Sequence, residues 1–560
     1  MTLTGAQIII KTLIELGVTD VFGYPGGQII NVYDALYEYR DQINHVLTAH
    51  EQGAAHAADG YSRATGKVGV VIATSGPGAT NLVTGIATAM LDSVPMVAIT
   101  GNVPCSLIGK DSFQEIDITG ITLPITKHNY FVHKVEDLAD IIREAFVIAK
   151  SGRPGPVLID VPKDVQMAKY EYEPKSIEEK MDLPKADKSL IDQAVELISH
   201  SIRPYIYIGG GVAGLGMGQK IIDFANKIDG VIGSTFMGLS AVPTDSERFL
   251  GMQGMHGHYA SSIAQNEADL IIGIGVRFSD RATGNVKKFA KRSKIIQLDV
   301  DFAEVNKNVK VDLGIVGDVE DAVCRIFDKC EQKSNPDWMH TVKFLREEEK
   351  RFEQEIADAN ECKLSPKQVL EVINANKPPR TIIATDVGQH QMWTAQYANF
   401  DAPRRFVSSG GLGTMGFGLG AAIGAYVATG DKTVLVTGDG SFGMNLNELV
   451  TATTYNLPIV VVLMNNGVLG MVRQWQTLFF GKRYSNTVLE RKTDYVALAK
   501  AFGGNGYVAT TPEEFEEAFV KALKADGPVV IDTRIDKDEF VLPMLPPGGA
   551  IDDIITNVKK

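Results

Sequence analysis

Two short motifs in the last third of the chain carry the residue types of a metal site. Gly438-Asp439-Gly440-Ser441 follows one apolar run, and Asn465-Asn466 follows the next one along the chain. Glycines let backbone N–H groups approach an anion, while carboxylate and amide oxygens are ligands that suit Mg²⁺. Turns also favour Gly, Asp and Asn for conformational reasons, which is the alternative interpretation. The two motifs at this spacing predict that Asp439 and Asn466 clamp a metal-bound diphosphate.

Two further motifs lie in the same third, and the first of them follows a predicted strand. One opens a helix whose N-terminal N–H groups would attract phosphate, and its Gln389 and His390 could add donors. In the other, residues 409–416, glycines such as Gly413 would let the backbone approach a flat ring. A histidine at a helix start is often structural, and Met415 is either a soft apolar wedge under the ring or a core residue.

A solitary acidic residue, Glu51, stands beside an Ala-rich helix predicted over residues 53–61. It is either an ordinary helix N-terminal charge or a carboxylate in a poorly hydrated pocket, where it can share a proton. A second strand-to-helix turn, at residues 74–81, contains Pro77 and Asn81. Many α/β turns have this composition, so by itself it is weak evidence for a site.

Apolar β-branched runs alternate with helical patterns along the chain, which predicts a parallel α/β architecture. With 560 residues the chain is too long for one core. Charged, weakly periodic stretches at 166–190 and 329–366 divide it into three doubly wound parallel-sheet domains, at 1–165, 190–330 and 366–545. The predicted strands are 68–74, 96–100, 157–161, 205–209, 231–234, 270–275, 295–299, 381–386, 434–437, 459–464 and 529–533.

The first and third domains look like variations on one layout. The motifs mostly lie at the carboxyl ends of predicted strands, where open α/β sheets bind ligands.

Bulk composition excludes several classes of protein. A formal net charge of −13 argues against a nucleic-acid partner, which would need a basic face. The N-terminus has neither a basic n-region nor a long apolar stretch, so no signal peptide or membrane span is expected. The cysteines lack ligand spacing and are too few for a disulfide framework, which favours a reduced cytoplasmic setting; they are Cys105, Cys324, Cys330 and Cys362.

Together these motifs resemble those of the thiamine-diphosphate (ThDP)-dependent decarboxylase superfamily, and within it the acetohydroxyacid synthase (acetolactate synthase) catalytic subunit. The narrow signals are Gly388-Gln389-His390-Gln391-Met392-Trp393 and Gly470-Met471-Val472-Arg473-Gln474-Trp475, whereas the diphosphate motif marks only the superfamily. Phe22–Gly27, His50-Glu51, Ser75–Gly78 and Phe113-Gln114 also match, so that the resemblance covers essentially the whole chain. It implies pyrimidine-binding, central FAD-binding and diphosphate-binding domains, in this order.

The resemblance also implies roles for single residues. Glu51 would contact the pyrimidine N1′, and Asp439, Asn466 and the backbone carbonyl of Val468 would hold Mg²⁺. Glu51 of one chain would face Asp439 of a second, because the family builds its site across a dimer interface. The first-substrate pocket would involve Phe113, Gln114 and Lys163, and the other ThDP contacts would be Pro77, Asn81, Gln389, His390, Gly413, Met415, Gly440 and Ser441.

Glycines 209–211 after a predicted strand could form a dinucleotide turn, but a bare glycine cluster is weak evidence. Other segments resemble the FAD-binding parts of biosynthetic acetohydroxyacid synthases. The Arg-Phe-x-Asp-Arg pattern at 277–281 favours FAD, since FAD-free catabolic members of the family depart from it. Surface ion pairs are the alternative for its two arginines, and Asp299 could accept from a ribose or ribityl hydroxyl. The expected FAD contacts are Arg153, Gly210, Gly211, Met255, His256, Gly275, Arg277, Asp299 and Asp318.

The implied reaction is transfer of a two-carbon aldehyde unit in branched-chain amino-acid biosynthesis. Pyruvate is decarboxylated, and the hydroxyethyl carbanion joins a second 2-ketoacid, pyruvate or 2-oxobutyrate. Arg281 would bind the carboxylate of this acceptor, as a planar fork suits a carboxylate, and Trp475 its alkyl end. The alternatives are a catabolic acetolactate synthase without FAD, a pyruvate oxidase, a simple decarboxylase, or a non-catalytic scaffold, which would be expected to lack Glu51 or Asp439.

Assembly and inhibition stay open at this point. Dimer and tetramer are equally compatible with the sequence. A regulatory small subunit, which biosynthetic members of the family usually have, would have to be another chain. Gln28, Cys105 and Ser106 depart from the family pattern near the channel into the site, so inhibitor sensitivity does not transfer to this chain.

Overall fold

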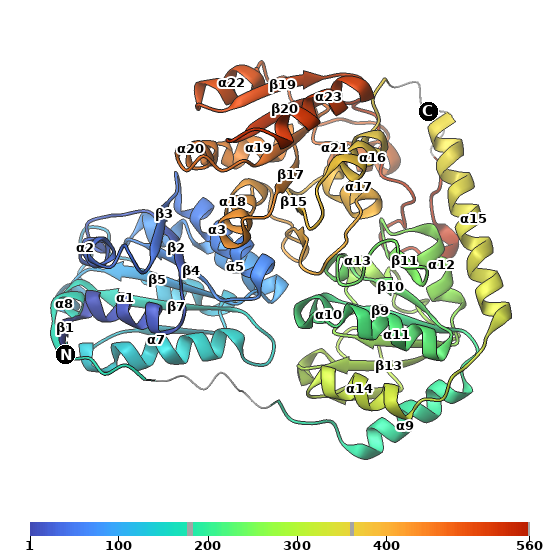
Figure 1. The fold of residues 1–560 in the computed structure, drawn as a ribbon, viewed down its shortest axis with the longest axis horizontal. Helices are drawn as coiled ribbons and strands as arrows, with labels where there is room; N and C mark the ends of the chain where they lie inside the picture. Colours follow the sequence, from blue (N-terminus) through green and yellow to red (C-terminus); the bar gives the residue numbers. More distant parts are fainter. Residues whose placement is uncertain (176–182, 359–362, 558–560) are drawn as a thin grey trace.

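The computed structural model describes residues 1–175, 183–358 and 363–557, which form three α/β units. Figure 1 shows the first unit in blue and cyan, the central unit in green and the third in orange and red. In the described residues each unit contains one six-stranded parallel sheet. The predicted α/β class with three parallel-sheet domains is therefore confirmed.

The first and third units share one strand order. The first sheet has the order β3-β2-β4-β5-β7-β6, and the third has the order β16-β15-β17-β18-β20-β19. In each sheet the strand that comes second in the sequence lies at the edge, next to the strand that comes first. The first sheet contains β2 (Asp20–Gly23), β3 (Asn44–Leu47), β4 (Gly69–Ala73), β5 (Met96–Asn102), β6 (His128–Phe131) and β7 (Pro156–Pro162). The third contains β15 (Ile382–Thr385), β16 (Phe406–Val407), β17 (Thr433–Gly438), β18 (Val460–Asn465), β19 (Asn505–Ala509) and β20 (Val529–Arg534). The common layout expected for these two units is confirmed.

The central sheet has a different order, β11-β10-β9-β12-β13-β14. This is the 3-2-1-4-5-6 order of dinucleotide-binding folds, which reverses direction between β9 and β12. Its strands are β9 (Pro204–Ile208), β10 (Val231–Ser234), β11 (Phe249–Met252), β12 (Leu270–Ile274), β13 (Lys294–Asp299) and β14 (Leu313–Val316). The glycines at 209–211 follow β9 and Gly275 follows β12, so both turns lie at the reversal point.

Helices connect and cover these strands. The first unit has α1 (Gly5–Glu15), α2 (Ile30–Glu38), α3 (Glu51–Thr65), α4 (Pro77–Thr80), α5 (Val83–Asp92), α6 (Ile118–Thr122), α7 (Val135–Lys150) and α8 (Lys163–Met167). The central unit has α9 (Lys188–His200), α10 (Gly210–Leu215), α11 (Gly218–Ile228), α12 (Tyr259–Glu267), α13 (Asp280–Thr283) and α14 (Val319–Lys329). The third has α16 (Pro366–Asn376), α17 (Gln389–Tyr397), α18 (Gly418–Thr429), α19 (Asp439–Asn445), α20 (Leu449–Thr454), α21 (Gly470–Phe479), α22 (Tyr495–Ala501) and α23 (Pro512–Leu523).

All eleven predicted strands are observed, while the sequence missed several short ones. β3, β6 and β19 are edge strands that expose part of their residues, so their sequences lack a continuous apolar run. The chain also contains one antiparallel pair that was not expected, between β1 (Thr2–Thr4) and β8 (Lys169–Glu171). This pair fastens the start of the first unit to its end.

The charged stretch at 329–366, which was predicted to divide two domains, contains one long helix, α15 (Pro336–Asp358). Trp338, Val342 and Leu345 are buried in an apolar cluster with Tyr205 and other residues of the central unit. Figure 1 shows α15 in yellow along the outer side of that unit. α15 therefore packs on the central unit beyond the boundary predicted at residue 330.

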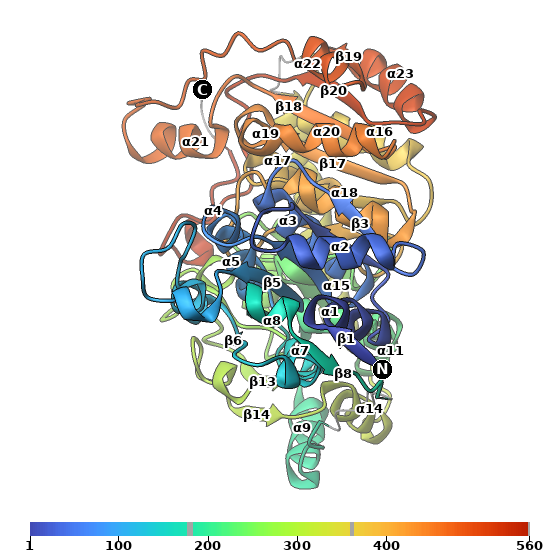
Figure 2. The same ribbon diagram turned by 90° about the vertical axis from the view of Figure 1, so that its left-hand side faces the viewer.

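Helices α3 and α18 join the first unit to the third through very close packing, and they lie side by side in both views (Figures 1 and 2). A β-carbon added to Gly60 would lie 2.1 Å from the carbonyl oxygen of Ala421. One added to Gly424 would lie 1.7 Å from the carbonyl oxygen of Ala57. Only glycine fits at either position, because the obstacle is backbone.

Two further observations concern the expectations from composition. Among the helices of the described residues, none combines the length and the apolar character that a membrane crossing requires. Cys105, Cys324 and Cys330 are free thiols, while Cys362 lies outside the described residues.

We expect Gly424→Ala to destabilise the chain by about 1–3 kcal/mol, because the new methyl group overpacks the α3–α18 contact. Helix propensity alone would make alanine more stable here by about 1 kcal/mol, so a loss reports on packing. The matched control is Gly527→Ala, since a β-carbon at Gly527 meets open space. Urea unfolding of both variants measures the effect, and equal midpoints would contradict the prediction.

Candidate active site

The carboxyl edge of the third sheet brings the predicted metal ligands together. Asp439 begins α19 directly after β17, and Asn466 follows β18, the neighbouring strand. The side-chain oxygen of Asn466 accepts from the N–H of Val468 at 3.2 Å. Asp439, Asn466 and Val468 therefore lie in neighbouring turns, and each can offer an oxygen ligand.

Electrostatics at this edge suit a cation. Asp439 is 4% exposed, and burial raises the pKa of its carboxyl to about 6, although Arg491 and backbone N–H groups lower it. The described residues contain no cluster of three His, Cys, Asp or Glu side chains that could hold a metal alone. A metal at Asp439 would need further oxygens, which a diphosphate can provide.

His390 and Gln389 lie at the start of α17, on the same edge. His390 is buried, burial lowers its pKa to about 3, and its Nε2 has no hydrogen-bond partner. A buried, unpaired ring nitrogen fits a site that a polar ligand fills. The side-chain N–H donors of Gln389 instead reach Gln474 Oε1 at 3.0 Å and the carbonyl of Glu539 at 2.8 Å. Gly440 and Ser441 follow Asp439 in α19 and are buried.

The predicted residues of the first unit lie at the carboxyl edge of its own sheet. Glu51 accepts a hydrogen bond from the side-chain amide of Asn81 at 3.0 Å, and Pro77 begins the short α4. In the described residues no hydrogen bond or ion pair links Glu51 or Asn81 to Asp439.

Phe113, Gln114 and Lys163 surround the same edge. The Phe113 ring is 83% exposed, and Gln114 has a φ of 62°. A β-carbon added to Gly76 would lie 3.0 Å from Gln114, so this loop rests on the turn that precedes α4. Lys163 donates to the carbonyl of Gly27 at 3.1 Å.

A cavity of about 1690 Å³ lies between the central unit and its neighbours. Its lining includes the nine predicted FAD residues: Arg153, Gly210, Gly211, Met255, His256, Gly275, Arg277, Asp299 and Asp318. It also includes Gly413, Met415, Arg281 and Trp475. The structure thus joins the predicted FAD site, one part of the ThDP site and the predicted acceptor site in one cavity.

Local partners hold Arg153 in this cavity, whereas the buried Nδ1 of His256 has no hydrogen-bond partner. Arg153 pairs with Glu304 at 2.7 Å and donates to Ser93 at 2.8 Å. Burial raises the pKa of Asp299 to about 6, and burial together with Arg153 lowers the pKa of Arg277. His256 is buried, and its pKa falls to about 4.

Arg281 and Trp475 adjoin at one end of the cavity. The Arg281 guanidinium lies 5.9 Å from the centre of the Trp475 ring, within cation–π range. Arg281 also forms a loose ion pair with Asp280 at 3.6 Å, which is the surface pairing considered above as an alternative. The Trp475 Nε1 is buried and has no hydrogen-bond partner.

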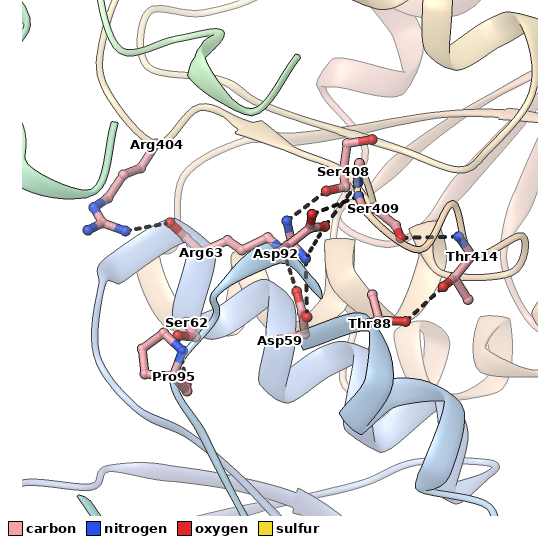
Figure 3. A network of polar contacts seen from close by, with 12 residues as sticks. Asp59, Ser62, Arg63, Thr88, Asp92, Pro95, Arg404, Ser408, Ser409 and Thr414 are labelled. Carbon is pink, nitrogen blue, oxygen red and sulfur yellow. Dashed lines mark hydrogen bonds and ion pairs between the residues drawn. The ribbon is translucent and has the colours of Figure 1, made fainter. Parts of the chain in front are cut away.

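A network of buried charges, which was not among the predicted site residues, holds the glycine loop at residues 408–416. Asp92, at the end of α5, accepts from the N–H groups of Gly410 at 2.9 Å and Gly411 at 2.7 Å, and Figure 3 shows it beside Arg63. Arg63 of α3 pairs with Asp92 at 3.0 Å and with Asp59. Arg63 also donates to the carbonyl of Ser408 at 2.7 Å.

The same loop has two further anchors. The hydroxyls of Thr88 and Thr414 lie 2.7 Å apart (Figure 3). Asp386, buried after β15, accepts from the N–H groups of Gly416 at 2.8 Å and Gly418 at 3.1 Å. The only sequence signal for the network was a charged pair, Asp59 and Arg63, four residues apart on an Ala-rich helix.

Comparison with known proteins agrees with this geometry. Residues 3–121, 191–326 and 386–533 match the N-terminal TPP binding domain, the central domain and the C-terminal TPP binding domain of thiamine pyrophosphate enzymes. The chain is 45% identical to acetolactate synthase isozyme 2 large subunit of Escherichia coli, over 99% of both chains. It is 44% identical to a probable acetolactate synthase large subunit of Methanocaldococcus jannaschii, over 99% of this chain and 95% of the relative.

A third relative is the acetolactate synthase large subunit of Corynebacterium glutamicum, which is 45% identical over 99% of this chain and 90% of its own length. The chain belongs to the thiamine pyrophosphate (ThDP) enzymes. Within that class it belongs to the acetolactate synthase large-subunit family, so the resemblance found in the sequence is confirmed. The assignment of roles to single residues is a proposal, developed below.

We expect Asp92→Asn to destabilise the chain by about 1–3 kcal/mol, because an amide can accept from only one of the two loop N–H groups and no longer pairs with Arg63. The matched control is Glu517→Gln, a change in an exposed pair with Lys521 that should cost less than about 1 kcal/mol. Urea unfolding measures both variants, and a loss in the control as large as in Asp92→Asn would contradict the prediction.

Proposed function

We propose that the chain catalyses acetolactate synthesis: pyruvate loses CO₂, and the remaining two-carbon unit joins a second 2-ketoacid, pyruvate or 2-oxobutyrate. The observation that carries this proposal is one cavity whose lining includes Arg281 and Trp475 as well as Gly413 and Met415. An acceptor held there would lie next to the loop that faces the cofactor. The relatives' names support the same reaction and a place in branched-chain amino-acid biosynthesis.

ThDP would supply the stabilised carbanion on which this chemistry depends. Asp439, Asn466 and the carbonyl of Val468 would hold its diphosphate through Mg²⁺, and the unpaired Nε2 of His390 supports a polar ligand there. Gly440 and Ser441 would lie along the diphosphate, with Gln389 beside them. Met415 and Gly413 would contact the rings.

Glu51 would hold and return a proton at the pyrimidine N1′, and Pro77 and Asn81 would shape its pocket. The hydrogen bond from Asn81 fixes one oxygen of Glu51, which supports an oriented carboxylate. Phe113, Gln114 and Lys163 would line the first-substrate side. The 83% exposure of Phe113 in one chain supports a site completed by a second copy, and so a homodimer or a tetramer.

Arg281 and Trp475 would bind the acceptor ketoacid from two sides. The guanidinium suits its carboxylate, and the flat indole suits its alkyl end. At 5.9 Å from the ring centre, the Arg281 fork lies at a separation that a small 2-ketoacid can span.

FAD is the third cofactor that we propose, bound by the nine residues that line the central cavity. The dinucleotide strand order and the glycine turns at its reversal point support this assignment. At these turns a β-carbon on Gly211 would lie 3.0 Å from the α-carbon of Gly275, so the two loops pack as closely as glycines allow. A catabolic enzyme without FAD is the alternative.

We also propose a partner and a cellular location. The relatives named here are large subunits, which supports a separate regulatory small subunit as partner. The use of cysteine in the sequence favours a cytoplasmic location.

Purified chain supplied with ThDP, Mg²⁺ and FAD should convert pyruvate to acetolactate, and added 2-oxobutyrate should give 2-aceto-2-hydroxybutyrate. Chromatography of the products measures both. Each cofactor is removed in turn as a control. Acetyl phosphate as product would instead indicate an oxidase, acetaldehyde a decarboxylase, and full activity without flavin a catabolic acetolactate synthase.

We expect Trp475→Leu to keep acetolactate formation but to lower the preference for 2-oxobutyrate over pyruvate by about tenfold, the worth of one methylene contact. The product ratio with both acceptors present measures the preference. Phe480→Leu, at the C-terminal cap of the same helix and outside the cavity, is the control and should leave the ratio unchanged. An unaltered ratio in Trp475→Leu would exclude this role for the indole.

A further inference from the structure

A buried carboxylate of the third unit, Glu448, contacts the turn that carries Glu51. Glu448 is fully buried, at 0% exposure, and ends a short 3₁₀ turn (Leu446–Glu448) that continues directly from α19. Its Oε2 accepts from the N–H of Ala49 at 3.1 Å, and its Oε1 from the N–H of His50 at 3.0 Å. Thr451 donates to Oε2 at 2.7 Å. One carboxylate thus receives hydrogen bonds from both residues that precede Glu51.

The surroundings of Glu448 are shaped to this contact. A β-carbon on Gly53 would lie 2.1 Å from Glu448 Oε1, so only glycine leaves room for the carboxylate. Burial raises the pKa of Glu448, while Thr451 and the N–H groups of Ala49 and His50 lower it. The N-terminal end of α3 points at the carboxylate, and a negative charge is favourable at that end of a helix.

We propose that Glu448 is a positioning residue for catalysis. It fixes the turn at Ala49 and His50, and thereby the direction in which the Glu51 side chain projects from α3. Glu51 is the first residue of α3 and directly follows Ala49 and His50, whose N–H groups bind Glu448. Ala49 and His50 donate from consecutive residues to two different oxygens, which fixes the orientation of the turn as well as its position. The inference rests on the proposed role of Glu51.

The geometry distinguishes this role from packing alone. Removing a single acceptor leaves a buried N–H group unpaired and frees the turn, while the apolar α3–α18 contact is untouched. Glu448 touches no predicted cofactor ligand, so it can affect proton transfer only through Glu51. A change at Glu448 should therefore have no effect once Glu51 is already lost.

The first test is amide hydrogen exchange in the full-length chain without cofactors, read by mass spectrometry on a peptide that covers residues 47–53. In Glu448→Gln one N–H group loses its acceptor, and exchange in this peptide should become about tenfold faster. Thr451→Val, which leaves both backbone bonds, is the control and should change exchange by less than about twofold. Unchanged exchange in Glu448→Gln would overturn the proposal.

The second test is the rate at which the C2 proton of bound ThDP exchanges with solvent deuterium in the holoenzyme, quenched and read by NMR. Glu448→Gln should slow this exchange about tenfold in the wild-type background and less than twofold in a Glu51→Gln background. An equal slowing in both backgrounds would overturn the proposal, because Glu448 would then act independently of Glu51.

A second variant covers the case in which Glu448→Gln does not fold. Gly53→Ala pushes the carboxylate away from the turn and should reproduce both effects. If Gly53→Ala changed neither the amide exchange of residues 47–53 nor the C2 proton exchange of ThDP, the proposal would also be overturned. Failure of the proposed function would be seen in the product analysis of the wild-type chain. The amide hydrogen-exchange test is independent of that result, because it requires no catalytic activity.

Discussion

The close approach of α3 and α18 is the constraint on which the arrangement of the site depends. Gly60 and Gly424 let the two helices meet backbone to backbone, which fixes the first unit on the third without a connecting segment. Both ends of α3 are then bound by charges from the third unit. Glu448 accepts from the N–H groups at its start, and Arg404 donates to the carbonyl of Arg63 at 3.2 Å near its end. These signs match the helix dipole at each end.

The buried charges near the C-terminal end of α3 are tolerated because each is paired several times. Burial alone would lower the pKa of Arg63, but Asp59 and Asp92 together raise it. Asp92 also accepts from the N–H groups of Gly410 and Gly411, so the carboxylate that neutralises the arginine also fixes the shape of the loop. Breaking such a set strands a charge in the interior, which makes the loop conformation hard to change.

The fold was largely predictable from the sequence, and the site only in part. Buried parallel strands are continuous apolar runs, which is why β17 and β18 and the motifs after them could be found. Edge strands such as β3 and β19 keep polar residues and lack that signal. Glu448 and Asp92 could not be found, because their partners lie about 400 and 320 residues away in the chain and neither sits in a motif. Long-range hydrogen bonds to backbone leave no trace in the identity of the partner residue.

The glycine loop shows why the missed residues matter to the predicted ones. Gly413 and Met415 lie on a loop whose one side lines the large cavity and whose base is fastened to Asp386, next to the diphosphate turn. One loop therefore lines the large cavity and also contacts the turn after Asp439, where the N–H of Gly416 donates to Ser441 at 3.2 Å. Glycine-rich backbone cannot supply that rigidity by itself, since it has no side chains to pack. The charged network from α3 and α5 supplies it, so residues of the first unit stiffen a loop of the third.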